Sequence, residues 1–136
     1  DCGIFSKKSN VREKIAKHII QFGYKTPTII SRLAVVSEYA NIKEGVTVGH
    51  GSVVNANACI GKFCIINTGA IVEHSTTIGN FCHISTGVIV NGDVNIGDGT
   101  FVGSGSIVRE GLKIPENTII SAGSRVMGWP LRSMMQ

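Results

Sequence analysis

The sequence has few charged residues and few aromatic residues. Charged side chains make up 16% of its 136 residues and aromatic side chains 6%, whereas 43% of the residues are hydrophobic. This hydrophobic content argues against a disordered chain and indicates one folded domain. The net charge of +4 is small, and the basic residues are scattered apart from a lysine-rich beginning. Because no basic stripe or aromatic platform accompanies the charge, we expect no nucleic-acid partner.

The sequence also lacks long apolar runs and cysteine pairs of the Cys-x-x-Cys type. No run of 18 apolar residues is present, so we expect no membrane span. No signal peptide is visible, and the four cysteines are not spaced as metal or redox motifs. We therefore expect a cytoplasmic protein whose cysteines are reduced.

A six-residue repeat organises most of the chain. From Val36 to Val126 every sixth residue is valine or isoleucine, without an insertion. The residue two positions earlier is usually small, as at Ala58 and Ala70. Six residues fit a short strand followed by a turn, with one aliphatic side chain per unit pointing inward. Three units close a triangular coil, so the fifteen units between residues 36 and 125 predict five stacked coils.

A series of glycines indicates that the full period is eighteen residues. Glycine occupies successive positions eighteen apart, at Gly51, Gly69, Gly87, Gly105 and Gly123. A six-residue repeat alone does not require this series, because other hexads carry different residues at the same place. One edge of the predicted prism is therefore lined by glycine, which suits a positive φ or the close approach of another group.

Different segments flank the repeat. Asn10 is a candidate cap for an amphipathic N-terminal helix that ends at Gly23, and Pro130 ends regular structure after the last hexad. The predicted boundaries are 1–35 for the helix and a connector with the first strand, 36–127 for the β-helix, and 128–136 for a C-terminal tail.

The repeat also accounts for three of the cysteines, of which Cys59 follows Ala58 near a corner. Cys64 and Cys82 are eighteen residues apart at the small inward position, so we expect them to be stacked, buried and unbonded. We expect no metal site, because the histidines include no close pair. The chain has four of them, His18, His50, His74 and His83.

The hexads resemble those of the left-handed β-helix acyltransferases. The segments 66–87 and 91–97 narrow the resemblance to the bacterial branch that acetylates sialic acid or nucleotide-linked amino sugars. The resemblance covers residues 10–132 and implies an all-β fold, a left-handed parallel β-helix of about five triangular coils with a short N-terminal helix. It also implies acetyl-CoA as cosubstrate, a sugar acceptor, a homotrimer with active sites between subunits, and a role in bacterial surface-glycan biosynthesis.

The resemblance assigns roles to individual residues. His74 matches the general base, His83 a contact to acetyl-CoA, and Asn67 an active-site asparagine. Ser104 and Ala122 match positions that line the CoA groove. The eighteen-residue period is compatible with such a groove. Ser104 and Ala122 are eighteen apart, and each precedes a glycine of the series, so small residues would line this edge of the prism.

Two further residues complete the candidate site. Gly92 follows His74 by eighteen residues and should lie one coil above it, so its N–H is our candidate donor to the oxyanion. Relatives often carry an acidic residue directly after the base, but here Ser75 stands in that place. The Ser75 hydroxyl, a water molecule or Glu73 is then left to orient the His74 ring.

The spacing of the histidines favours a site between subunits. His74 and His83 are half a coil apart, so they should lie on different parts of the triangle. We therefore predict that neighbouring prisms of a trimer bring them together. The family usually has an N-terminal βαβ-type domain that holds the sugar, and residues 1–35 are expected to be a remnant of it. Arg125 and Arg132 are either contacts for CoA phosphates or solvated surface charges.

Two functions from different classes are compatible with the sequence. The first is a sugar acetyltransferase, with transfer to nitrogen or to oxygen left open. The second is a catalytically silent solenoid that serves as an assembly module.

Overall fold

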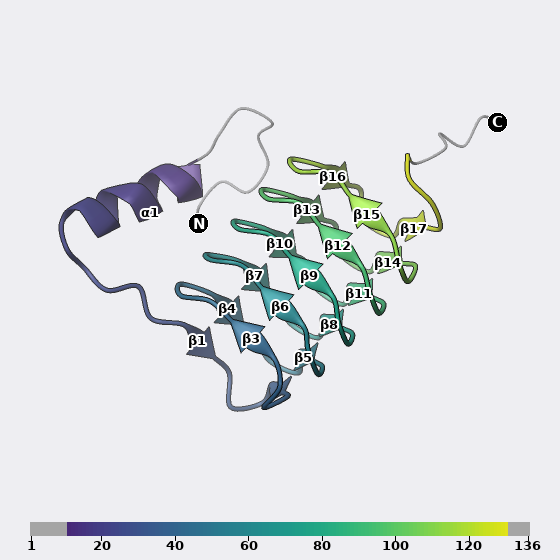
Figure 1. Cartoon of the computed structure of the whole chain (residues 1–136), viewed down its shortest axis with the longest axis horizontal. Coiled ribbons are helices and arrows are strands. Elements are labelled where there is room, and N and C mark those ends of the chain that lie inside the picture. The colour runs from purple at the N-terminus through teal and green to yellow at the C-terminus, as the bar shows by residue number, and fades with distance from the viewer. Residues whose placement is uncertain (1–10, 131–136) are drawn as a thin grey trace.

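A computed structural model describes residues 11–130, which form one helix followed by a parallel β-helix (Figure 1). Helix α1 spans Val11–Gln21 and ends before Gly23, whose φ of 75° is the left-handed conformation typical of a helix C-terminus. Glu13 in its first turn and His18 in its last turn suit the helix dipole. The expected cap Asn10, and Arg132 near the C-terminus, lie outside the described residues.

The β-helix is built from seventeen two-residue strands, one per hexad, in three parallel sheets. Sheet A contains β1 (Ile29–Ile30), β4 (Thr47–Val48), β7 (Ile65–Ile66), β10 (His83–Ile84), β13 (Phe101–Val102) and β16 (Ile119–Ile120). Sheet B contains β2 (Val35–Val36), β5 (Val53–Val54), β8 (Ile71–Val72), β11 (Ile89–Val90), β14 (Ile107–Val108) and β17 (Arg125–Val126). Sheet C contains β3 (Asn41–Ile42), β6 (Cys59–Ile60), β9 (Thr77–Ile78), β12 (Asn95–Ile96) and β15 (Lys113–Ile114).

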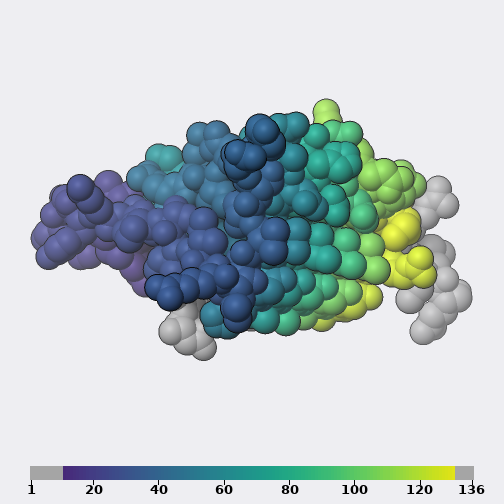
Figure 2. Space-filling view, turned by 90° about the horizontal axis from the view of Figure 1, so that it is seen from below, coloured from purple at the N-terminus to yellow at the C-terminus, as the bar shows by residue number. Residues whose placement is uncertain are grey.

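The register of the sheets confirms the eighteen-residue coil. Each strand pairs with the strand three further along, so that His83 lies opposite Ile65 on one side and Phe101 on the other. The solenoid of about five coils is therefore the predicted one. Its first strand, β1, falls one hexad before Val36, within the segment expected to hold a connector and a first strand. The coils follow one another along the long axis of the molecule (Figure 2).

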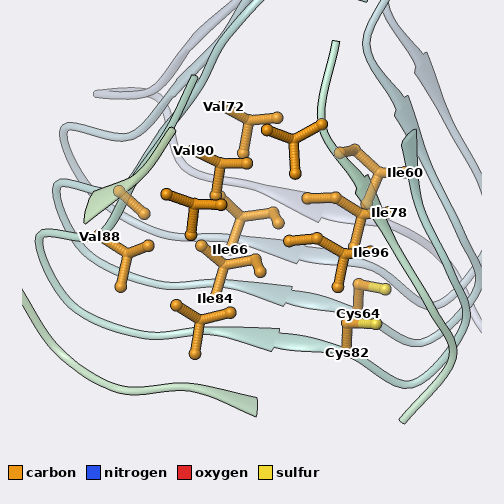
Figure 3. Packing of buried hydrophobic residues seen from close by; sticks show 14 of the residues in the cluster. Ile60, Cys64, Ile66, Val72, Ile78, Cys82, Ile84, Val88, Val90 and Ile96 are labelled. Atoms are coloured by element: carbon orange, nitrogen blue, oxygen red, sulfur yellow. The ribbon is translucent and has the colours of Figure 1, made fainter. Parts of the chain in front are cut away.

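The interior is a column of stacked aliphatic side chains (Figure 3). The repeat's valines and isoleucines from Val48 to Val126 are all buried, whereas Val36 and Ile42 at the open end are only partly buried. Serine and threonine are accepted at the small inward positions because their hydroxyls are satisfied. Ser52 and Thr76, for example, donate hydrogen bonds of 2.7 and 2.8 Å to backbone carbonyls fifteen residues on.

Cys64 and Cys82 are buried, unbonded and stacked, as predicted (Figure 3). Each thiol donates to a backbone carbonyl, Cys64 to Gly79 at 2.9 Å and Cys82 to Gly97 at 3.2 Å. The hydrogen bond to Cys82, together with burial, raises the pKa of the Cys64 thiol. Both residues therefore serve packing.

The corner between sheets A and B differs from the other two corners. From residue 45 to residue 123, one residue in every hexad has a positive φ. Phe63, Ser75 and Asp93 adopt it at the other corners, so this conformation does not by itself demand glycine. At the A–B corner all five positions are glycine, and a Cβ added at any of them would meet nothing within 4 Å. This edge of the prism is bare and open to another molecule.

Candidate active site

The predicted site residues lie at two different corners of the prism. His74, Ser75 and Gly92 stand at the corner between sheets B and C, hereafter the B–C corner. The other four residues lie on the opposite side of sheet B, with His83 on strand β10 of sheet A and the rest at the A–B corner, namely Asn67, Ser104 and Ala122. Strand β8 runs from one group to the other. A single chain therefore does not bring the two groups together.

At the B–C corner the imidazole of His74 lies against Gly92. A Cβ built on Gly92 would stand 2.8 Å from Cε1 and 2.9 Å from Nε2 of His74, closer than real side chains approach one another. Asp93 donates its N–H to the carbonyl of His74 at 3.1 Å, which places Gly92 one coil above His74 as predicted. Glycine at this position leaves the space that the exposed ring occupies.

The N–H of Gly92 is available to a ligand. Within residues 11–130, no carbonyl or side chain accepts a hydrogen bond from it. Other turn residues of the solenoid share this property, and the neighbouring imidazole is what distinguishes Gly92. A proton acceptor and a backbone donor thus stand side by side, which is the combination that acyl transfer requires.

Two neighbouring side chains contact His74. Ser75 Oγ lies 3.5 Å from Nδ1, whereas the Glu73 carboxylate accepts from the backbone N–H of His74 at 3.3 Å. Of the two side chains considered from sequence, the Ser75 hydroxyl is therefore the one beside the ring. A hydroxyl can donate or accept, so either tautomer is compatible with this contact. In the tautomer in which Nδ1 donates a hydrogen bond to Ser75 Oγ, the lone pair lies on Nε2, the nitrogen next to Gly92.

His83 is held by a chain of hydrogen bonds on the sheet A side. The Thr68 N–H donates to Asn67 Oδ1 at 2.8 Å, which turns the Asn67 amide nitrogen toward His83 Nε2 at 3.2 Å. That nitrogen is a donor, so Nε2 accepts and the proton of the neutral ring is on Nδ1. The Phe101 ring packs edge-on against the imidazole, with centroids 5.3 Å apart.

The Nδ1 atom of His83 has no partner among residues 11–130, although the residue is only 6% exposed. A buried donor without an acceptor is costly, and a bound ligand would relieve that cost. Burial, followed by the charge of Arg12, lowers the pKa of His83 to about 4. The ring is therefore neutral at pH 7 and offers one N–H.

The low pKa of His83 predicts a loss of stability in mild acid. In the unfolded chain a histidine titrates near 6.5, so below that pH the unfolded state binds a proton that the folded state does not. Stability should fall as the pH is lowered from about 6.5 towards 4. We expect the urea midpoint to drop more between pH 7 and pH 5 in the wild type than in His83→Gln. His50→Gln, which changes an exposed histidine, should behave like the wild type. Equal drops in all three proteins would contradict the prediction.

Sequence reasoning missed two residues at this site. Arg12 of α1 donates to the carbonyl of Phe81, and to that of Cys82 at 3.2 Å, at the turn just before β10. Nothing in the sequence signals this contact across about seventy residues. The second residue is Ser85, whose Oγ lies 2.9 Å from Ser104 Oγ. The eighteen-residue period could have found it, because Ser85 follows Asn67 by one full coil.

In the part of the chain that the structure describes, no three histidine, cysteine or acidic residues are grouped so as to hold a metal ion. Among the same residues, no helix has the length and hydrophobicity needed to cross a membrane.

The geometry defines the chain as a hexapeptide-repeat parallel β-helix with two separate groups of candidate site residues. No protein-family model and no curated protein matches the sequence. Solved structures of acetyltransferases do match. A variant of perosamine N-acetyltransferase from Caulobacter crescentus, in complex with CoA and GDP-perosamine, is 32% identical with a TM-score of 0.84. The acetyltransferase domain of PglB from Neisseria gonorrhoeae, in complex with acetyl coenzyme A, is 29% identical with a TM-score of 0.86.

These structures confirm the resemblance to sugar acetyltransferases with a β-helix of hexapeptide repeats. WeeI from Acinetobacter baumannii, at 24% identity and a TM-score of 0.82, shares the fold. The alignments with the C. crescentus and N. gonorrhoeae proteins cover 90% of this chain but 60% of theirs. The chain thus spans about 60% of the length of the proteins it resembles.

Proposed function

We propose that the protein is an acetyl-CoA-dependent sugar acetyltransferase that acts in the cytoplasm in bacterial surface-glycan biosynthesis. The observation that carries the proposal is the His74 imidazole packed against Gly92, whose N–H has no acceptor among residues 11–130. The similar structures support it, because one holds acetyl coenzyme A and another holds CoA with GDP-perosamine. The acceptor is an amine or hydroxyl of a nucleotide-linked amino sugar or of sialic acid.

In the proposed reaction, His74 Nε2 takes the proton of the acceptor as its nitrogen or oxygen attacks the thioester carbonyl. The carbonyl oxygen becomes an oxyanion, which accepts a hydrogen bond from Gly92 N–H. When the intermediate collapses, the carbon–sulfur bond breaks, and the CoA thiolate leaves and receives the proton from His74. The step uses the tautomer of His74 in which Nδ1 carries the proton and donates to Ser75 Oγ.

We place acetyl-CoA along the bare A–B corner. Ser104 and Ala122 are exposed there, each beside a glycine whose missing side chain leaves room for an extended pantetheine arm. The Nδ1–H of His83 donates a hydrogen bond to the cosubstrate, and Asn67 contacts the acceptor sugar. Because these residues and His74 stand at different corners, we place each site between two copies of a homotrimer.

Gly92→Ala should lower the activity and leave the fold intact. The added methyl group needs the space that the His74 ring fills, so the ring must move. A displacement of about 1 Å can cost ~10²-fold in rate, and we expect kcat to fall by that order. The φ of Gly92 is not positive, so the melting temperature should change little. Gly128→Ala is the matched control, since a Cβ there meets nothing. Full activity of Gly92→Ala would refute the placement of the ring.

Isothermal titration calorimetry with acetyl-CoA distinguishes the enzyme from a silent solenoid. The enzyme should bind acetyl-CoA, and binding should weaken in Ser104→Tyr, whose side chain would fill the corner. A scaffold has no such site. The absence of a heat of binding, measured with folded protein at millimolar acetyl-CoA, would refute the proposal.

A further inference from the structure

Along the B–C corner of the described coils, the small inward position carries a single hydroxyl. This position lies two residues before each inward aliphatic residue, and in successive coils it is occupied by Ala40, Ala58, Thr76, Val94 and Leu112. Thr76 is fully buried, and the burial of a hydroxyl is costly unless it finds a hydrogen-bond partner. Since alanine serves the fold at this position in neighbouring coils, packing alone does not require threonine.

The hydroxyl of Thr76 holds the turn that begins with Asn91. Its Oγ1 donates a hydrogen bond of 2.8 Å to the Asn91 carbonyl in the coil above. Within residues 11–130, no backbone N–H donates to this carbonyl. Asn91 is also held from its other side, because its backbone N–H and its amide nitrogen both donate to the Val108 carbonyl, at 3.1 and 2.7 Å. The turn is therefore anchored to the coil below it by Thr76 and to the coil above it by Val108.

Other buried hydroxyls of the solenoid make the same kind of contact, but their acceptors have a second donor. Thr100 Oγ1 donates at 3.0 Å to the Pro115 carbonyl, which also accepts from Thr118 Oγ1 at 2.7 Å. The same is true of the carbonyls that accept from two buried serines, Ser52 and Ser106. At these turns the loss of one hydroxyl leaves the carbonyl with a partner, whereas the carbonyl at the B–C corner would lose its only one.

The Asn91 carbonyl and the Gly92 N–H belong to the same peptide group. This peptide is trans, since the cis peptide found within residues 11–130 is Trp129–Pro130. In a planar trans peptide the carbonyl and the N–H point in opposite directions. Thr76 draws the carbonyl toward the interior of the prism, so the N–H points outward, to the surface on which the His74 ring is exposed.

We propose that Thr76 is a positioning residue for acetyl transfer, because its buried hydroxyl fixes the direction of the N–H of Gly92. This inference rests on the proposed function, in which that N–H donates to the oxyanion. A donor that is already aimed at the oxyanion stabilises it without reorganisation during the reaction. Because Thr76 is fully buried, it acts on the reaction only through the peptide group between Asn91 and Gly92.

Thr76→Val removes the hydroxyl and keeps the shape of the side chain. The Asn91 carbonyl then lacks a donor in the interior, so the peptide group rotates toward water and the N–H of Gly92 turns with it. We expect kcat to fall by about 10–10²-fold, because a small misplacement of a reacting group is costly, with the KM for acetyl-CoA unchanged. Thr76→Ser keeps the hydroxyl and should stay within a few-fold of the wild type.

Thr100→Val is the matched control. It removes a buried hydroxyl from the same position of another hexad, at the corner between sheets C and A, where Thr118 still holds the Pro115 carbonyl. Its kcat should match the wild type. Circular dichroism reports folding, and Thr76→Ala with Thr100→Ala replaces the valine pair if Thr76→Val unfolds, since Ala58 occupies the same position one coil below.

The direction of the Gly92 N–H can also be measured without a substrate. Residual dipolar couplings of the backbone amides report the orientation of each N–H bond, and that of Gly92 should change in Thr76→Val but not in Thr76→Ser or Thr100→Val. An unchanged Gly92 coupling in folded Thr76→Val, or wild-type kcat despite a changed coupling, would overturn the inference. A wild type that transfers no acetyl group would refute the proposed function, whereas the couplings would still decide whether Thr76 directs the N–H.

Discussion

His74→Ala should lose most of its acetyl transfer while it keeps its fold. A general base contributes about 10²–10⁴-fold to a rate, and no other imidazole stands at the B–C corner, so we expect kcat to fall within that range. His74 is exposed on a turn and fills no part of the core. The variant should therefore have the melting temperature of the wild type. The loss of activity should appear in kcat rather than in the KM for acetyl-CoA. Stopped assays of CoA release measure both constants.

His50→Ala is the matched control for this experiment. His50 is exposed and occupies the same position of its hexad as His74, but it stands at the A–B corner beside Ser31, at 2.5 Å from its Oγ. Its replacement should leave kcat within a few-fold of the wild type. A folded His74→Ala protein with wild-type kcat would remove His74 from the mechanism.

Ile84→Ala should cost more stability than the other substitutions discussed above. Ile84 is fully buried in the middle of the prism, stacked between Ile66 and Val102 of the neighbouring coils. Removing a buried isoleucine side chain typically costs about 2–5 kcal/mol, because the apolar contacts are lost and a cavity remains. In a solenoid each coil is supported by its two neighbours, so the loss weakens both contacts. Urea unfolding gives the difference in free energy.

Ile119→Ala is the control for that measurement. Ile119 is an isoleucine of the same sheet but is 43% exposed, and it points outward. We expect its free energy of unfolding to change by less than ~1 kcal/mol, as is usual at the surface. If Ile84→Ala and Ile119→Ala were equally stable, the aliphatic column would not be what holds the coils together.

The fold was predictable because the contacts between its coils occur at a fixed spacing in the sequence. A residue at position i meets the residue at i + 18, so the positions of Val48 and Ile66 in the sequence determine their positions in the prism. The same rule placed Gly92 over His74 and stacked Cys64 on Cys82. The contact of Arg12 with Phe81 and Cys82 obeys no spacing, because α1 lies outside the repeat.

The chemistry of the site was only partly predictable. The resemblance pointed to Asn67 and His83 but not to the hydrogen bond between them, which fixes the proton of His83 on Nδ1. The low pKa of His83 depends on burial and on Arg12, and both follow from the tertiary structure. Similarly, Ser75 looked like the loss of an acidic partner, whereas the structure places its hydroxyl beside the His74 ring.

The proposed reaction is acetyl transfer from acetyl-CoA to a sugar. The most direct measurement is mass spectrometry of nucleotide-linked amino sugars and sialic acids after incubation with acetyl-CoA and the protein. We expect at least one acceptor to gain a single acetyl group, with an equal amount of CoA released, and His74→Ala to form far less product. The absence of an acetylated product with every acceptor, from a folded wild-type protein shown to be trimeric, would refute the proposed reaction.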